Sequence, residues 1–155
     1  MENKLVLKLF TMEQVELLYK WANDPDCRKN SFQTESIPYE THVKWCSDKL
    51  ESNDVDIYIA YLNSIPVGQL RVMYKERTAL ISYSIDKNFR GLGLGLQLIQ
   101  SIEKYRLYGE NNINELVGKV KLDNIASQKV FEKCYYEKIV ENDHFVYRKY
   151  IKSEL

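Results

Sequence analysis

The chain has 155 residues, a length that fits one domain able to bury a core without disulfides or metal. Lys and Arg together number 22, Asp and Glu together also number 22, and 45% of the residues are hydrophobic. This balanced charge excludes the global field of a nucleic-acid-binding or membrane-surface protein, so local chemistry must hold any anionic ligand.

The three cysteines, Cys27, Cys46 and Cys134, are widely spaced, and no C-x-x-C pair occurs. This pattern predicts neither a disulfide framework nor a metal site, and it favours a reducing cytoplasm. Lys8 interrupts the first apolar run, so we expect no signal peptide. Because no stretch approaches the ~18 apolar residues of a membrane span, we expect a cytoplasmic protein.

The first half of the chain predicts a strand and two helices. Residues 4–10 alternate as a strand, with Leu5, Leu7 and Leu9 on one face. Thr11 and Gln14 form a capping box that opens the first helix. Residues 23–39 contain two prolines and lack a clear period, so we expect a long connection, functional or irregular. A second helix is expected over about 40–50.

The second half predicts a strand meander followed by alternating helices and strands. In chain order we expect strands over 56–62, 66–74 and 79–85, a helix over 92–107, a strand over 115–120, a helix over 124–134, and strands over 135–140 and 144–151. No linker interrupts this order, so residues 1–155 read as a single mixed α/β domain.

A glycine-rich turn joins the strand that ends at Ile85 to the following helix. It reads Arg90-Gly91-Leu92-Gly93-Leu94-Gly95. Glycines at a helix start permit close backbone approach and positive φ, and the first helical N–H groups have no intrahelical partner. The turn is therefore suited to bind a phosphate or pyrophosphate. Neither the phosphate-loop pattern nor the dinucleotide pattern G-x-G-x-x-G fits the spacing.

The spacing that fits is R-x-x-G-x-G, formed by Arg90, Gly93 and Gly95. Here the chain resembles the GNAT superfamily, whose acetyl-CoA pyrophosphate loop carries this pattern after the fourth strand. A second motif, Asn124-Ile125-Ala126-Ser127 followed by Phe131, resembles the family's helix beside the coenzyme. By itself Asn124 is a good helix cap, the more common role of such a residue.

The resemblance implies a GNAT (acyl-CoA N-acyltransferase) fold, with a mostly antiparallel mixed sheet flanked by helices, and acetyl transfer from acetyl-CoA to an amine. It implies that two strands splay apart, so that pantetheine pairs with the main chain near Ile85 and Lys87 and an amide there stabilises the oxyanion. The implied coenzyme residues are Ile85, Asp86, Lys87, Arg90, Gly91, Leu92, Gly93, Leu94, Gly95, Leu96, Asn124, Ser127 and Phe131.

The proton-transfer residues stay open at this point. Many relatives place a tyrosine as general acid where this chain has Phe131, which cannot donate a proton. The candidate acids and bases are Glu35, His42, Tyr83 and Tyr136, with a water relay or the amine's own proton as alternatives. For His42, a satisfied surface or core histidine is the commoner situation.

The acceptor segment of the superfamily comprises the first two helices and their connection. The pattern W-x-N-D-P-x-x-R, from Trp21 to Arg28, resembles a broad branch that includes ribosomal-protein and sugar acetyltransferases. Its continuation resembles the enzymes of pseudaminic-acid-type biosynthesis, which acetylate the 4-amino group of a UDP-linked amino sugar. The implied acceptor residues are Trp21, Asn23, Arg28, Phe32, His42, Trp45 and Tyr83.

Simpler structural roles compete with these assignments. Trp21 and Trp45 also fit as helix core residues, and Arg28 as a solvated surface charge. Three functions therefore remain: an acetyltransferase for a nucleotide-linked amino sugar, one for a protein N-terminus or small amine, and an acyl-CoA-binding domain without catalysis. No metal and no nucleic-acid or membrane partner is expected, and the chain is expected to be a monomer or homodimer.

Overall fold

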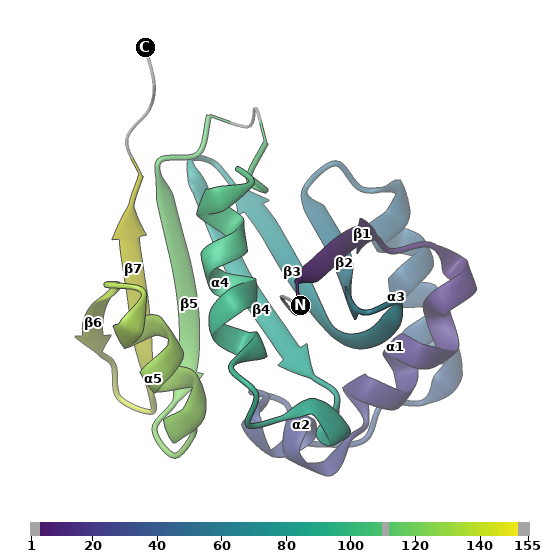
Figure 1. Cartoon of the computed structure of the whole chain (residues 1–155). Coiled ribbons are helices and arrows are strands. Elements are labelled where there is room, and N and C mark those ends of the chain that lie inside the picture. Colours follow the sequence, from purple (N-terminus) through teal and green to yellow (C-terminus); the bar gives the residue numbers. More distant parts are fainter. Residues whose placement is uncertain (1–3, 110–111, 152–155) are drawn as a thin grey trace.

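The computed structural model describes residues 4–109 and 112–151, which form an open seven-stranded sheet flanked by helices (Figure 1). The sheet order is β1-β2-β3-β4-β5-β7-β6, and only β4 and β5 pair in parallel among the described strands. The strands are β1 (Leu5–Leu9), β2 (Val55–Leu62), β3 (Ile65–Lys75), β4 (Thr78–Ile85), β5 (Glu115–Lys121), β6 (Glu137–Val140) and β7 (His144–Tyr150). These positions confirm the predicted strands and the predicted mixed sheet.

The helices match the predicted ones, with one addition. They are α1 (Val15–Ala22), α2 (Pro25–Asn30), α3 (Tyr39–Glu51), α4 (Leu94–Lys104) and α5 (Ile125–Lys133), with 3-10 turns η1 (Met12–Gln14) and η2 (Lys87–Phe89). The prediction missed α2. Its signals were present, because Asp24 caps the Cys27 N–H at 3.1 Å and Pro25 occupies the first helical position.

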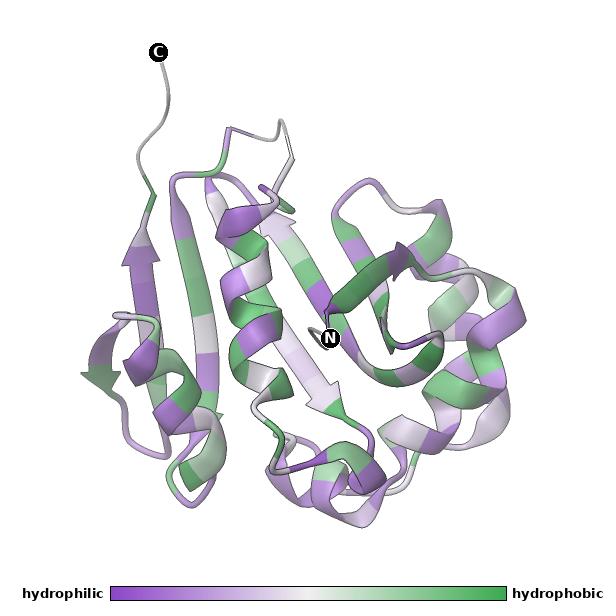
Figure 2. Cartoon of the chain, in the orientation of Figure 1, coloured by the Kyte–Doolittle hydropathy of each residue, from purple (hydrophilic) through white to green (hydrophobic). Residues whose placement is uncertain are grey.

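Two hydrophobic clusters hold the helices on opposite faces of the sheet. On one face, buried residues of α4, including Leu98 and Ile102, pack with β3, β4 and β5. On the other, Leu18 of α1 and Cys46 of α3 pack against Ile57 of β2 and its neighbours. Figure 1 shows α4 and α5 in front of the sheet and α3 behind it, and Figure 2 shows apolar and polar residues alternating around α4.

The contact between β5 and α5 requires a glycine. A Cβ added to Gly118 would lie 2.3 Å from Cζ of Phe131, whose ring is stacked on Tyr147 with centroids 5.4 Å apart. Phe131 is only 2% exposed, so its ring has no free space into which to move.

We therefore expect Gly118→Ala to lower the free energy of unfolding by about 1–3 kcal/mol, the usual cost of overpacking a core. Urea denaturation measures the change. Combining Gly118→Ala with Phe131→Leu should recover part of the loss relative to the sum of the two single changes. A Gly118→Ala protein as stable as the wild type would contradict this packing.

Candidate active site

The parallel strands β4 and β5 pair over only half of their length. Their register runs from Thr78 opposite Glu115 to Ile81 opposite Gly118, and then the pairing stops. On their outer sides, β4 continues to pair with β3 as far as Ile85, and β5 continues to pair with β7 to its end. The splayed strands that the family resemblance implied are therefore present.

The backbone of Ile85 faces this gap. The N–H of Asp86 donates to the Val67 carbonyl at 2.8 Å, so the backbone of Asp86 points toward β3. Because successive residues of a strand point their backbone groups to opposite sides, the N–H and C=O of Ile85 point away from β3. The Ile85 carbonyl accepts a hydrogen bond from Nε of Arg90 at 3.1 Å. The N–H of Ile85 is directed into the space between the splayed strands.

The glycine turn leaves the start of α4 open. Gly91 and Gly93 have φ of +80° and +77°, and a Cβ at either position would meet nothing within 4 Å. No side chain caps α4, and the bond from the Gln97 N–H to the Gly93 carbonyl, 3.2 Å, belongs to its first turn. The N–H groups at residues 94–96 therefore have no capping side chain and lie at the positive end of a helix, an arrangement suited to an anion.

Arg90 links the glycine turn to α2, so it is not an unpaired positive charge beside the turn. Its two terminal nitrogens donate to Asp26 and Asp24, each at 2.8 Å. Burial acts to raise the pKa of Asp24, but the hydrogen bonds from Arg90 and the Cys27 N–H lower it overall. Since the two carboxylates offset the charge of Arg90, the groups left to attract an anion at this turn are the backbone N–H groups.

Tyr83 lies where β4, α4 and α5 meet. Its hydroxyl donates to Oγ of Ser127 at 3.1 Å, and a Cβ on Gly95 would lie 3.1 Å from its ring. Ser127 follows Asn124, whose side chain caps α5 by accepting from the Ser127 N–H at 3.3 Å. Burial raises the pKa of Tyr83. Its hydroxyl therefore stays protonated, next to the two helix starts that carry the family motifs.

Phe131 and Tyr136 belong to the core behind this site. The centroid of the Phe131 ring is 6.4 Å from that of Tyr83 and 5.0 Å from that of Tyr136. Tyr136 is 6% exposed, and burial raises the pKa of its hydroxyl, with the nearby Glu103 adding to the shift. Glu103 belongs to the last turn of α4, at the opposite end from the glycine turn. The structure thus separates Tyr136 from the gap, which removes it from the candidate acids.

His42 lies between α1 and α3 and not beside the gap. Its Nε2 contacts the Val15 carbonyl at 3.1 Å and the Cys46 sulfur at 3.4 Å, and the side chain is buried. Burial lowers the pKa of His42. A buried imidazole that is hydrogen-bonded to a helix carbonyl has a packing role. His42 is therefore removed from the candidate bases and from the candidate acceptor contacts. Glu35 is exposed in the connection before α3.

Arg28 and Asn23 organise the connection between α2 and α3. Arg28 donates to the carbonyls of Ala22, Gln33 and Glu35 at 2.6, 2.9 and 3.3 Å, and to the Ser31 hydroxyl at 3.2 Å. The Asn23 side chain both donates to and accepts from the backbone of Ile37, at 3.0 and 2.7 Å. These bonds use four N–H donors of Arg28, so its main role is to shape the loop.

The aromatic residues of the acceptor segment divide into buried and exposed ones. Trp21 is 4% exposed and donates its indole N–H to Asp86 at 2.8 Å, so it links α1 to the end of β4. Trp45 is partly buried. Phe32 is 52% exposed and meets the ring of His144 edge-on, with centroids 5.3 Å apart. Phe32 is thus available to a ligand, whereas Trp21 is a core residue.

A surface pocket connects the acceptor segment with the turn after β4. It is bordered by α1, the start of α2 and the end of β4, and its lining includes Lys20, Trp21, Asp24, Ile85, Lys87 and Arg90.

Within residues 4–109 and 112–151, no three His, Cys, Asp or Glu side chains are grouped as metal ligands would be. In the same part of the chain, no helix has the length and hydrophobicity needed to cross a membrane.

Solved structures with the same fold include acetyltransferases of several kinds. RimL, a ribosomal L7/L12 alpha-N-protein acetyltransferase solved with coenzyme A, is 18% identical with TM-score 0.82, covering 97% of this chain and 96% of its own. Spermidine N-acetyltransferase from Vibrio cholerae, solved with CoA and spermine, is 15% identical with TM-score 0.81, and the match covers 97% of this chain and 96% of that chain. N-acetyltransferase PseH from Campylobacter jejuni is 16% identical with TM-score 0.73, and the match covers 96% of this chain and 99% of that chain. Such low identities establish the fold alone.

The family follows from the sequence. No curated protein matches the chain. Residues 4–137 match the model of the acetyltransferase (GNAT) domain, and this segment includes both the glycine turn and the helix that begins after Asn124. The chain therefore belongs to the GNAT acetyltransferase family, as an acetyl-CoA-dependent N-acetyltransferase that acts on an amine.

Proposed function

We propose that the acceptor is the primary amine of a nucleotide-linked amino sugar. The observation that carries this proposal is the charge of the sheet face opposite α5. Because Gly118 faces α5, the side chains of Lys119 and Lys121 project from the other face of β5. Neither lysine forms an ion pair with another described residue, and the Lys121 amine donates to the Lys29 carbonyl of α2 at 2.9 Å.

A nucleotide-linked sugar matches this face in two ways. Its diphosphate would pair with the unpaired lysines. Its flat base would stack on the exposed ring of Phe32, which lies against His144 at the start of β7. The motif that resembles the pseudaminic-acid-type enzymes runs through the same segment of the chain. A polyamine or another strongly cationic acceptor would be repelled here.

On the coenzyme side, the proposed site consists of the open N–H groups and the gap between the strands. The N–H groups at residues 94–96 would hold the pyrophosphate, and the free edge of β4 near Ile85 would pair with pantetheine. Acetyl-CoA supplies the activated acyl group as a thioester. The Ile85 N–H would donate to the carbonyl oxygen as negative charge develops there. Holding amine and thioester together would provide most of the acceleration.

For proton transfer we propose Tyr83 as the general acid. Position 131 lacks a hydroxyl, and the Tyr83 ring lies next to Phe131 with its hydroxyl oriented by Ser127. A tyrosine kept protonated by burial is able to donate to a departing thiolate. Glu35 and a water molecule stay as candidate bases, since Glu35 is exposed on the acceptor segment.

Thiol release with a panel of amines tests the acceptor. We expect a higher kcat/KM for a UDP-linked 4-amino sugar than for spermidine or for a peptide with a free N-terminus. A clear preference for the peptide or the polyamine would contradict the proposal. If acetyl-CoA bound without turnover on any amine of the panel, the chain would instead be a coenzyme-binding domain.

A further inference from the structure

Arg71 lies in the middle of β3, on the face of the sheet that is covered by α1 and α3 and on which we place the acceptor. It pairs with Ile57 of β2 and with Ser82 of β4 in the register of the strands. Ser82 is the first residue of β4 beyond the last pair with β5, Ile81 with Gly118. Arg71 therefore lies one strand away from the point where the gap between β4 and β5 opens.

The guanidinium of Arg71 has no hydrogen-bond or ion-pair partner among the described residues. Its Nε is buried without a hydrogen bond, and no salt bridge of the described chain includes it. Its neighbours are the Trp45 ring, 5.1 Å from the guanidinium carbon, and two residues of α2, Cys27 and Arg28. Burial lowers the pKa of Arg71, and the charge of Arg28 acts in the same direction.

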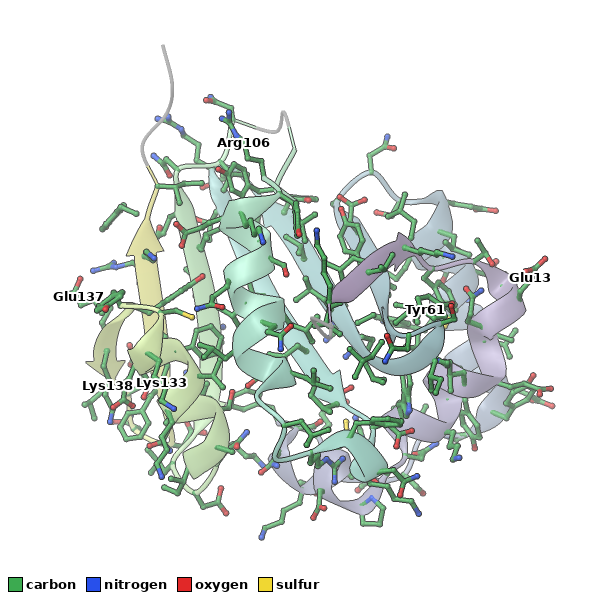
Figure 3. All side chains as sticks on the ribbon, viewed as in Figure 1. Glu13, Tyr61, Arg106, Lys133, Glu137 and Lys138 are labelled. Carbon is green, nitrogen blue, oxygen red and sulfur yellow. The ribbon has the colours of Figure 1, made fainter. Side chains whose placement is uncertain are left out.

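Three other arginines differ from Arg71 because each has oxygen atoms beside it. Arg28 donates to carbonyls, and Arg90 pairs with Asp24 and Asp26. Nε of Arg148 is also buried without a hydrogen bond, but it lies 3.4 Å from a Glu115 carboxylate oxygen. Figure 3 shows that the charged residues labelled there, such as Glu13 and Arg106, lie at the periphery. Arg71 is only partly exposed, and withdrawing a charge from water without a hydrogen-bonding partner is costly, so an anion beside the guanidinium would stabilise it.

We propose that Arg71 binds an anionic oxygen of the acceptor, from a phosphate or a carboxylate, in a subsite bordered by Trp45, Ser82 and α2. This inference rests on the proposed function in one respect: it assumes that the amine approaches from this face of the sheet. A guanidinium offers a planar pair of donors that suits phosphate and carboxylate oxygens. Trp45 restricts the orientation of the side chain by a cation–π contact. Arg71 would thus select acceptors that carry negative charge.

The test compares Arg71→Met with Arg148→Met, a matched control on the same sheet whose arginine already has carboxylate neighbours. Calorimetry would use protein saturated with coenzyme A, so that added nucleotide cannot enter the coenzyme site, with UDP and succinate as the two anionic probes. We expect UDP affinity to fall about 10- to 100-fold in Arg71→Met and to stay unchanged in Arg148→Met. KM for the acceptor should rise with little change in kcat, and the Kd for acetyl-CoA should not move.

The outcomes separate this inference from the proposed function. If wild-type protein bound succinate but not UDP, and Arg71→Met lost that binding, the nucleotide sugar would be wrong and the anion subsite would stand. Equal binding of both probes by wild type and Arg71→Met, or no binding of either by wild type, would overturn the subsite. An equal loss of acetyl-CoA affinity would also overturn it. Should Arg71→Met fail to fold, Arg71→Lys, which keeps the charge but not the planar pair of donors, should show an intermediate loss.

Discussion

Gly93→Val should weaken acetyl-CoA binding by at least about 100-fold, because it would disrupt the proposed charge-assisted hydrogen bonds to the pyrophosphate, which contribute about 1.5–3 kcal/mol each. Gly93 has φ of +77°, a conformation that a β-branched residue adopts only with strain. Its missing Cβ also leaves open the space beside the N–H groups at the start of α4. Valine would both distort the turn and fill that space. Isothermal titration calorimetry with acetyl-CoA measures the loss.

Gly109→Val is the matched control for backbone strain. Gly109 has φ of +62° and lies beyond the end of α4, away from the glycine turn. We expect this variant to lose stability while its Kd for acetyl-CoA stays within a few-fold of the wild-type value. If the two variants lost coenzyme affinity equally, the effect would be general destabilisation, and the role given to the turn would be wrong.

Tyr83→Phe should lower kcat by about 100-fold, at the lower end of what general acid–base catalysis contributes. The change removes the hydroxyl that Ser127 orients, but it keeps the ring that packs beneath Gly95. Coenzyme affinity and stability should therefore change little. Single-turnover thiol release with saturating acetyl-CoA measures the chemical step, and calorimetry measures the affinity.

The pH dependence of the rate gives an independent check on Tyr83. Burial raises its pKa above the ordinary value of 10.0, so the hydroxyl stays protonated throughout the neutral and mildly alkaline range. The alkaline limb of the kcat profile should begin above pH 10.0 in the wild type and should be absent in Tyr83→Phe. The hydrogen bond with Ser127 lowers the pKa of Tyr83, so Ser127→Ala should shift that limb to higher pH while keeping most of the activity. A Tyr83→Phe enzyme with wild-type kcat would exclude Tyr83 as the acid.

Local patterns predicted the sheet well, because strand alternation and turn residues act over a few positions. The meander from β2 to β4 matches its predicted bounds to within one residue at each end. Helix α2 was missed because six residues carry too little periodicity to predict a helix. Its usable signals were the cap Asp24 and Pro25 at the first helical position, but Pro25 together with Pro38 also suggested a loop, and the prediction followed that second interpretation.

The site residues divide according to whether their role depends on the backbone or on distant partners. The glycine turn was predictable, since backbone N–H groups at a helix start follow from local sequence. The pairing of Arg90 with Asp24 and Asp26 was not, because those residues lie more than sixty positions apart in the chain. Arg71 was overlooked for the same reason. An arginine inside a strand becomes notable only when the neighbouring elements leave it without a carboxylate.

We propose that the N–H groups at the start of α4 bind the two phosphates of coenzyme A, and a crystal structure of the complex with acetyl-CoA is the decisive measurement. We expect pyrophosphate oxygens about 2.7–3.2 Å from backbone nitrogens within residues 94–96, with pantetheine between β4 and β5. A complex with this turn empty and the coenzyme bound elsewhere would contradict it.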